Sequence, residues 1–139
     1  MSSVEVKSVA EPYLRLRAIA HLDAGKIVIF AGGTGNPYFT TDTAAALRAT
    51  EIEAEAIFMA KNGVDGVYDD DPRTNKKAKM FKEITCSEII KRDLKVMDLS
   101  AVEMLKNKDI DVRVFNMAKS ENFVKVTKGE DVGTVIKKG

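Results

Sequence analysis

Apolar residues at helical spacing open the chain, and a continuous apolar run follows them. Residues 9–25 carry most of one helical face, formed by Leu14, Leu16, Ile19 and Leu22. Pro12 suits the first turn of such a helix, and Gly25 suits its C-terminal end. Residues 26–31, KIVIFA, are mostly β-branched and aromatic without clear alternation. That pattern predicts a strand buried on both faces, as in a parallel sheet.

The alternation of helix-forming and strand-forming segments continues to the C-terminus. Residues 42–56 favour a helix with Thr41 or Asp42 as its N-cap, and residues 56–60 predict a second buried strand. Beyond a polar connection, the pattern predicts helices over 86–93 and 99–109, a strand over 111–117, a helix over 120–129 and a strand over 133–136. This order indicates an α/β domain with a largely parallel sheet flanked by helices.

The composition narrows the classes of function. The chain has 139 residues, the size of one ordinary domain, with a net charge of +1 and 45% hydrophobic residues. The balanced charge argues against nucleic acid or a membrane surface as a partner. No stretch reaches the roughly 20 apolar residues that a spanning helix needs. Because residues 1–10 lack the apolar segment of a signal peptide, we expect a cytoplasmic protein.

Cys86 and His21 are each the single residue of their type. A lone cysteine excludes an intrachain disulfide, and we expect Cys86 to be a small half-buried residue. His21 falls near the end of the first predicted helix, where a histidine is favourable for the helix dipole. Without a second histidine or a neighbouring cysteine nucleophile, a Ser-His or Cys-His catalytic pair has little support.

The glycine-rich segment AGGTGNPYFTTD, residues 31–42, lies between a predicted strand and a predicted helix. Free backbone N–H groups and the positive end of the helix dipole meet at such a junction, which favours anion binding. The two common phosphate motifs do not fit. Tyr38 stands where the dinucleotide motif needs its last glycine, and the P-loop lysine is missing because no lysine occurs between residues 27 and 60. A ligand-binding loop and a structural turn both stay open as interpretations.

The side chains of this segment have the chemistry to contact a nucleotide. Thr40 and Thr41 can donate hydroxyl groups to a phosphate, and the Asn36 amide can contact a base edge. Tyr38 and Phe39 can face a base or simply fill the core. The segment is therefore a candidate nucleotide site.

A second polar loop, NGVDGVYDDDP over residues 62–72, contains three consecutive aspartates. They do not follow the alternating acids of an EF-hand, so a solvated turn before Pro72 is the simpler interpretation. Two further residues have two interpretations each. Asp98 can cap the helix that begins near Leu99 or lie at a catalytic centre. Lys61 can approach a phosphate, although a surface lysine is the simpler interpretation.

Several segments together resemble the bacterial uridylate (UMP) kinases, which have the amino-acid kinase (carbamate kinase-like) fold. The likeness runs through IFAGGTGNPYFTTDTAAALRATEIEAE, AKNGVDGVYDDDPRTN, LKVMDLSAVEML, VRVFNM and GEDVGTVI, between residues 9 and 136. Among amino-acid kinases, the block TGNPYFTTD is specific to UMP kinases. The resemblance implies a phosphotransferase of pyrimidine nucleotide biosynthesis that converts UMP and ATP into UDP and ADP, with magnesium.

The resemblance also implies roles for individual residues. It implies a UMP site formed by Thr34, Gly35, Asn36, Pro37, Tyr38, Phe39, Thr40 and Thr41. It implies that the ATP nucleoside contacts Asn62, Tyr68 and Asp71. Asp42 and Asp98 match positions near the family's catalytic centre, where Asp42 would position groups or organise charge. No residue is assigned as a metal ligand.

Four features of the family have no counterpart in residues 1–139: its first strand, the Lys-x-Ser-Gly-Glu segment after it, a Gly-Gly-Gly-Asn loop and an arginine. We therefore expect a truncated amino-acid kinase domain that has the UMP and adenosine loops but lacks the N-terminal phosphate loops. Such a chain should have little activity alone, because charge on the transferred phosphoryl group is poorly neutralised. Uncovered apolar surface and sheet edge should favour self-association.

Two other functions compete with this interpretation. One is a non-catalytic nucleotide-binding or assembly fragment of the same family. The other is an amino-acid kinase that acts on a carboxylate or carbamate, which should need cationic residues in the glycine-rich loop, whereas residues 31–47 contain none. The resemblance to UMP kinases further implies a homo-oligomer, a hexamer in the family, with GTP and UTP as effectors.

Overall fold

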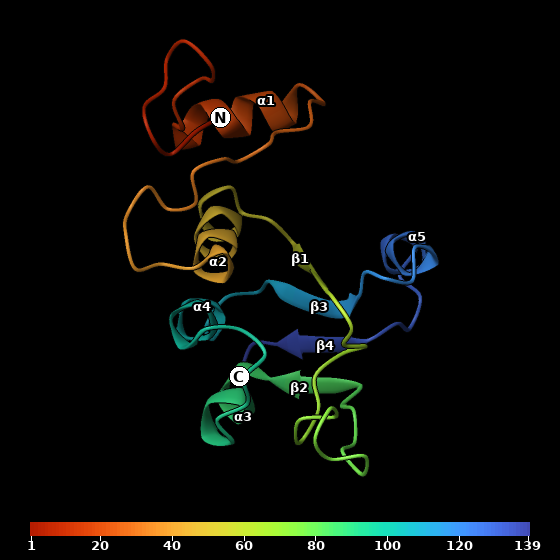
Figure 1. The fold of residues 1–139 in the computed structure, drawn as a ribbon. Coiled ribbons are helices and arrows are strands. Elements are labelled where there is room, and N and C mark those ends of the chain that lie inside the picture. Colours follow the sequence, from red (N-terminus) through yellow and green to blue (C-terminus); the bar gives the residue numbers. More distant parts are fainter.

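A four-stranded sheet forms the body of the molecule (Figure 1). The computed structural model describes all of residues 1–139. The strands are β1 (Ala56–Lys61), β2 (Glu83–Thr85), β3 (Asp111–Asn116) and β4 (Thr134–Lys137), in the spatial order β1-β3-β4-β2. β1 and β3 are parallel, as are β2 and β4, whereas β3 and β4 are antiparallel. The predicted α/β fold is confirmed, and its sheet is parallel at every pairing except the central one.

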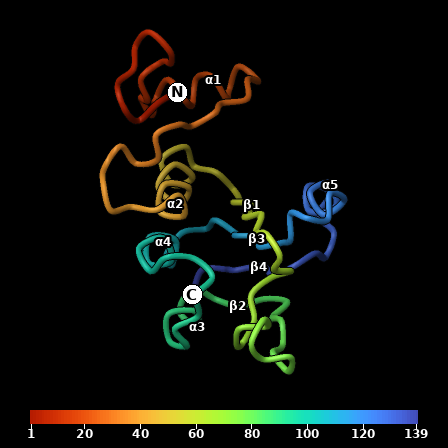
Figure 2. The backbone as a smooth tube through the Cα atoms, in the orientation of Figure 1, coloured from red at the N-terminus to blue at the C-terminus, as the bar shows by residue number.

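Helices lie on both sides of this sheet. They are α1 (Arg15–Asp23), α2 (Thr41–Glu51), α3 (Cys86–Lys91), α4 (Leu99–Leu105) and α5 (Glu121–Thr127). Helix α4 packs between α2 and α3, and α5 lies apart from them at the other side of the sheet (Figures 1 and 2). The alternation of β3 explains this arrangement. Val112 and Val114 enter the core shared with α4, and Phe115 packs edge-to-face on Phe123 of α5.

The main core is a single cluster of 15 buried residues contributed by the sheet, by α2, α3 and α4, and by the segments that join them. Leu105 and Val102 of α4 and Ile84 of β2 are almost completely buried in it. Burying one large aliphatic side chain stabilises a fold by about 1.5–3 kcal/mol. Cys86 also belongs to this cluster, so it is more buried than expected, and burial raises the pKa of its thiol. This core holds the strand ends that border the candidate site.

Helix α1 occupies only the second half of the segment 9–25. It begins at Arg15, so the expectation that Pro12 lies in its first turn is wrong. Pro12 instead forms an isolated bridge with Ser2, and the Tyr13 N–H donates to the Ser2 carbonyl group. These contacts keep the chain extended until just before the helix. The pairing with residues far from the helix overrides the local preference for a first turn.

The C-terminal end of α1 agrees with the sequence pattern, but its apolar face does not. Gly25 follows the helix with φ +73°, the left-handed conformation that favours glycine at this position. His21 lies in the last turn as expected, and its Nε2 is 3.0 Å from a Glu11 carboxylate oxygen. Leu14 and Leu16, which were expected to face a core, are exposed.

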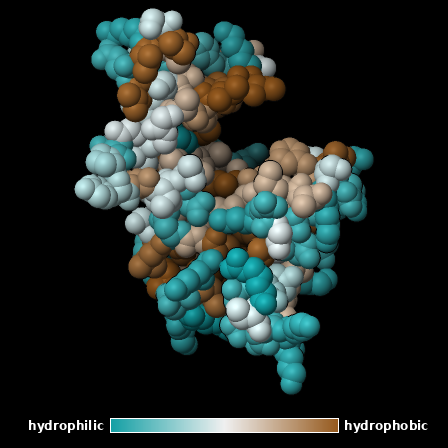
Figure 3. Space-filling view, viewed as in Figure 1, coloured by the Kyte–Doolittle hydropathy of each residue, from teal (hydrophilic) through white to brown (hydrophobic).

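The prediction of a buried strand over residues 26–31 is wrong for this chain. Ile27 is 94% exposed and Ile29 is 77% exposed. Only Ala31 makes a β-bridge, with Ser2. A buried strand needs neighbouring strands and apolar cover on its faces, and neither reaches these isoleucines. Figure 3 shows hydrophobic surface on this part of the molecule, above a notch that separates it from the sheet.

Arg48 of α2 connects the helix to the N-terminal residues. Its guanidinium donates to the Ser3 hydroxyl group over 2.7 Å and to the Glu51 carboxylate over 2.5 Å. It also lies 3.8 Å from the centroid of the Tyr13 ring, in cation–π contact. A buried charge requires such partners. The N-terminal part of the chain is thus attached to α2 through polar and stacking contacts.

Three smaller differences concern the two ends of α2 and the strand β2. The N-cap of α2 is Thr40, not Thr41 or Asp42, because the Thr40 hydroxyl oxygen accepts from two backbone N–H groups of the first turn. The same helix ends at Glu51 rather than near residue 56, since Glu53 has a left-handed φ of 58°. Strand β2, only three residues long, was not predicted. None of the helices has the length and apolar character to cross a membrane.

Candidate nucleotide site

Two adjoining cavities open beside the carboxyl end of β1. The first, the aspartate chamber, has a volume of about 460 Å³ and is bordered by Asp42 and Asp98. The second, the tyrosine chamber, has a volume of about 510 Å³ and is bordered by Tyr68 and Asp71. Five residues border both chambers: Lys61, Asp93, Leu94, Lys95 and Val96. Ligands of open α/β sheets bind beyond the carboxyl ends of strands, so the position suits a binding site.

Asp98 is the hydrogen-bonding centre of the aspartate chamber. As the N-cap of α4, its carboxylate accepts from the Ala101 N–H over 2.9 Å. It also accepts from the Thr43 hydroxyl group over 2.9 Å and from the Thr40 hydroxyl group. Partial burial opposes ionisation, but these hydrogen bonds together lower the pKa of Asp98. The capping interpretation is confirmed, and the same carboxylate ties the start of α2 to the start of α4.

Asp42 and Lys61 both border the aspartate chamber, and their charged groups lie next to each other. Asp42 lies in the first turn of α2, where a carboxylate is favourable for the helix dipole. Lys61 is the last residue of β1, and its Nζ lies 3.5 Å from an Asp42 carboxylate oxygen. Its side chain is only 34% exposed. The interpretation of Lys61 as a surface lysine is therefore wrong, since the side chain lies within the cleft.

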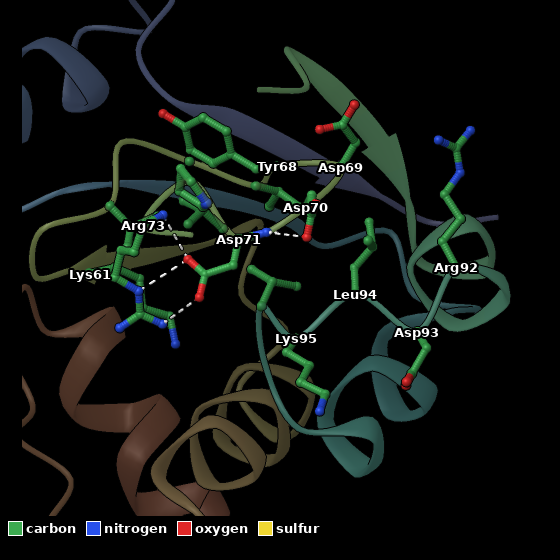
Figure 4. Close-up of a pocket in the computed structure, with 16 residues that line it drawn as sticks. Lys61, Tyr68, Asp69, Asp70, Asp71, Arg73, Arg92, Asp93, Leu94 and Lys95 are labelled. Atoms are coloured by element: carbon green, nitrogen blue, oxygen red, sulfur yellow. Dashed lines mark hydrogen bonds and ion pairs between the residues drawn. The ribbon is translucent and has the colours of Figure 1, made fainter. Parts of the chain in front are cut away.

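Tyr68 and Asp71 border the tyrosine chamber, whereas Asn62 is exposed outside it. The Asp71 carboxylate accepts from the backbone N–H of Arg73 over 2.9 Å and from its guanidinium over 3.1 and 3.2 Å. These bonds lower the pKa of Asp71. Figure 4 shows Asp71 and Arg73 joined at one side of the pocket, with Leu94 at the other. The structure thus brings together two of the three residues expected to contact ATP.

Asp69 and Asp70 are exposed, as a solvated turn predicts, but their carboxylates also accept hydrogen bonds from other residues of the loop. Asp69 accepts from the Lys79 N–H over 2.7 Å, and Asp70 accepts from the Asn75 side-chain amide over 2.8 Å. The Asp70 side chain also accepts from the backbone N–H of Asp71. These aspartates organise the loop that carries Tyr68. No group of three His, Cys, Asp or Glu residues in the chain is arranged to hold a metal ion.

The glycine-rich loop lies beside the aspartate chamber and is largely exposed between residues 31 and 40. Gly35 has φ +77°, and a Cβ at this position would lie 2.8 Å from the Ser3 carbonyl oxygen. Glycine is therefore required where the loop passes over the N-terminal residues. The Thr34 hydroxyl oxygen accepts from the Asn36 N–H over 3.1 Å, which closes a local turn.

Most side chains of this loop make no contact with either chamber. Tyr38 is fully exposed with a left-handed φ of 70°, and Phe39 is also exposed, so the interpretation that they fill the core is wrong. Thr41 and Pro37 are exposed as well. Of the eight residues expected to bind UMP, Thr40 is the one that reaches Asp98 through a hydrogen bond. The loop therefore lies at the rim of the aspartate chamber and does not line it.

The fold agrees with what comparison with known families finds. The model of the amino acid kinase family matches residues 7–116. This chain belongs to the amino acid kinase family. The matched region of this amino acid kinase begins before α1 and ends with β3, so it contains every candidate site residue from Thr34 to Asp98.

Individual relatives are similar over nearly the whole of this amino acid kinase chain. The uridylate kinase of Oenococcus oeni is 56% identical over 137 residues, which are 99% of this chain and 56% of that protein. A uridylate kinase of Streptococcus thermophilus is 56% identical over 135 residues, or 97% of this chain and 55% of that protein. The chain spans about half the length of the curated relatives it matches.

Solved structures give the same result. The UMP kinase from Bacillus anthracis superposes with a TM-score of 0.94 at 42% identity, covering 98% of this chain and 56% of that one. The UMP kinase from Ureaplasma parvum superposes with a TM-score of 0.92 at 35% identity, covering 99% of this chain and 59% of that one. The arrangement of helices and strands described above is therefore that of part of an amino acid kinase.

Sequence reasoning missed two contributors to the site of this amino acid kinase, Thr43 and the segment 93–96, and it took a third, Lys61, more simply as a surface residue. Thr43 donates to Asp98, and its position three residues after Thr40 would have placed both hydroxyl groups on one side of the helix start. Lys61 directly follows the strand predicted over residues 56–60, which already places it near the carboxyl end of that strand. The segment 93–96, which borders both chambers, carries no local motif that distinguishes it from an ordinary loop.

Proposed function

We propose that this chain is the C-terminal portion of a uridylate kinase, in which ATP phosphorylates UMP to give UDP and ADP. The observation that carries the proposal is the pair of chambers that meet at Lys61. A phosphotransferase must hold two nucleotides with their phosphates adjacent, and two pockets with a shared wall suit that task. The names of the relatives, uridylate kinase and UMP kinase, support the same substrates.

In this proposal the aspartate chamber receives the acceptor, UMP. The loop over residues 34–41 contributes hydroxyl and amide groups at the rim, and Thr40 links it to Asp98 below. Asp42 and Asp98 act by position and charge, because phosphoryl transfer depends mainly on alignment and electrostatic stabilisation. Asp98 remains ionised, in keeping with its lowered pKa, and orients both threonine hydroxyl groups.

The tyrosine chamber receives the adenosine of ATP. The Tyr68 ring supplies a flat face for adenine, and the Asp71 carboxylate is an acceptor for ribose hydroxyl groups. Asp71 is engaged by Arg73, so ribose binding would share that carboxylate or displace the guanidinium. Asn62 would reach the nucleotide only if the loop after β1 moves toward the chamber.

Magnesium would enter with the phosphates of ATP and neutralise part of their charge. The residues present fit this arrangement and not a protein-built cage. Asp42 and Asp93 are the carboxylates of the aspartate chamber without a hydrogen-bonded partner, and no group of three ligands exists. We further propose a cytoplasmic, homo-oligomeric enzyme with GTP and UTP as effectors, as the resemblance to UMP kinases implies.

The proposed domain assignment makes a prediction about rate. Residues 1–139 would bind both nucleotides but lack the family's lysine and glycine-rich phosphate loops, and loss of such groups costs orders of magnitude in rate. We expect the chain alone to bind UMP and ATP and to turn them over very slowly. The alternative, a non-catalytic nucleotide-binding fragment, predicts binding with no turnover at all.

Titration of the 139-residue chain with UMP and with ATP, followed by amide chemical shifts, tests the assignment. We expect shifts around Asp98 with UMP and around Tyr68 with ATP. Glutamate and aspartate as ligands serve as the control for a kinase of carboxylate substrates. A coupled assay for ADP then separates slow turnover from silent binding. Failure of both nucleotides to bind, or preference for an acidic amino acid, would overturn the proposal.

A further inference from the structure

Lys61 is the one cation held between the two chambers by a partly buried side chain. It ends β1, the strand whose carboxyl end opens into the cleft, and it borders both cavities. Lys95 also borders both, but it is exposed at the rim. In Figure 4, Lys61 lies on the side of the pocket that carries Asp71 and Arg73, across from Leu94 and Lys95.

The two arginines of the tyrosine chamber are already engaged with other protein groups. The Arg73 guanidinium makes two hydrogen bonds to Asp71. Arg92 donates to the Glu88 carboxylate over 3.1 Å and lies 5.3 Å from the centroid of the Phe81 ring. Both guanidinium groups are therefore committed to the protein, which leaves them less free to meet a phosphate.

The pairing of Lys61 is looser. Its Nζ is 3.5 Å from the nearest Asp42 oxygen, longer than the roughly 2.7–2.9 Å of a charge-assisted hydrogen bond. An ammonium group has three donors, and this contact leaves them available for other acceptors. Asp42 nevertheless attracts the ammonium group toward the boundary of the chambers. Asp42 thus holds the Lys61 ammonium group in position without forming a close hydrogen bond to it.

We propose that Lys61 contacts the phosphates at the boundary between the two chambers and so binds ATP through its phosphate chain. This inference rests on the proposed function, because it assumes that the chambers hold nucleotides. It adds a phosphate-binding residue, supplied by the end of β1 rather than by a glycine-rich loop. Asp42 then serves as the positioning partner of Lys61.

The test compares ATP with adenosine in titrations of the 139-residue chain, followed by amide chemical shifts. Lys61→Met should weaken ATP binding about tenfold or more, the usual effect of losing a hydrogen bond to a charged group, while adenosine binding stays unchanged. Lys61→Arg, which keeps the charge, should retain most of the affinity for ATP. The matched control is Lys82→Met, since Lys82 is paired with Asp131 over 3.1 Å but lies outside the cleft.

The outcomes separate the two proposals. If Lys61→Met leaves ATP affinity unchanged, or weakens ATP and adenosine equally, Lys61 does not bind phosphate and the inference is overturned. If the unaltered chain binds neither ATP nor UMP, the proposed function itself fails, and this is visible before any variant is made. If the amide spectrum shows that Lys61→Met does not fold, Lys61→Gln provides the same comparison, because glutamine also removes the charge but keeps a polar side chain.

Discussion

Two parts of this chain contain the same kinds of apolar residue and treat them in opposite ways. In the sheet and its helices, Ile84 is 2% exposed, whereas Ile27 in the N-terminal part is 94% exposed. Ile84 lies in a strand that the sequence pattern did not predict, and Ile27 lies in a run that it did predict to be a strand. The difference is in their partners, because β2 pairs with β4 while residues 27–30 make no strand pairing. An apolar pattern thus predicts a strand correctly only where a neighbouring strand and a covering helix are available.

The largest test of this difference compares one substitution in two helices. Leu105→Ala in α4 removes a buried core side chain and should reduce the free energy of unfolding by about 2–5 kcal/mol. Leu16→Ala in α1 removes an exposed side chain and should change it by less than about 0.5 kcal/mol. Urea unfolding followed by circular dichroism measures both. Similar losses in the two variants would mean that α1 is packed as tightly as α4.

A smaller effect is expected at the contact that joins α2 to α4. Asp98→Ala removes the N-cap of α4 and the acceptor for the hydroxyl groups of Thr40 and Thr43. Loss of a cap typically costs about 0.5–2 kcal/mol, and we expect the upper part of that range. The same unfolding measurement applies, with Asp23→Ala as the control, because Asp23 is exposed and its side chain makes no hydrogen bond or ion pair. A stability equal to that of the unaltered chain would show that the carboxylate does not tie α2 to α4.

The direction of the pKa shift of Asp98 determines how the stability of this contact depends on pH. The pKa of Asp98 is lowered in the folded state, so its contribution to stability is complete above the unfolded value of about 3.9 and disappears as the pH falls through the folded value. The difference in unfolding free energy between the chain and Asp98→Asn should be largest near neutral pH. It should shrink on titration toward pH 2. A difference that stays constant across this range would contradict the lowered pKa.

The smallest effect on stability is expected in the exposed apolar run. Replacing both Ile27 and Ile29 with serine should leave the free energy of unfolding within about 0.5 kcal/mol, because neither side chain is buried. It should, however, reduce self-association, since exposed apolar surface promotes contacts between copies. Light scattering after size-exclusion chromatography measures the mass. A marked loss of stability would mean that these side chains are covered within one chain.

The sequence pattern predicted the elements that depend on local information. Strands β1 and β3 and helix α4 were predicted because their apolar residues recur with the right period, and Asp98 was recognised as a cap by its place before α4. Strand β2 was missed because three residues, Glu83–Thr85, are too few to show a period. The run 26–31 was misjudged because its burial depends on partners that the run itself does not encode.

The candidate site was predictable residue by residue but not as an arrangement. Asp42, Tyr68 and Asp71 were selected through the resemblance to UMP kinases, and each borders a chamber. The contact of Thr43 with Asp98 joins two helices that are distant in sequence, so no local pattern reveals it. The proximity of Lys61 to Asp42 likewise arises from the packing of β1 beside α2.

The contacts of Arg48 help to fix the orientation of the glycine-rich loop. Its guanidinium also donates to the Gly33 carbonyl oxygen over 3.3 Å. One planar group therefore contacts the loop, the N-terminal residues and the ring of Tyr13 at the same time. A lysine could carry the charge but could not hold these groups at their relative angles. The orientation of the loop beside the aspartate chamber is therefore fixed by Arg48 of α2, together with the single bridge between Ala31 and Ser2 at the start of the loop.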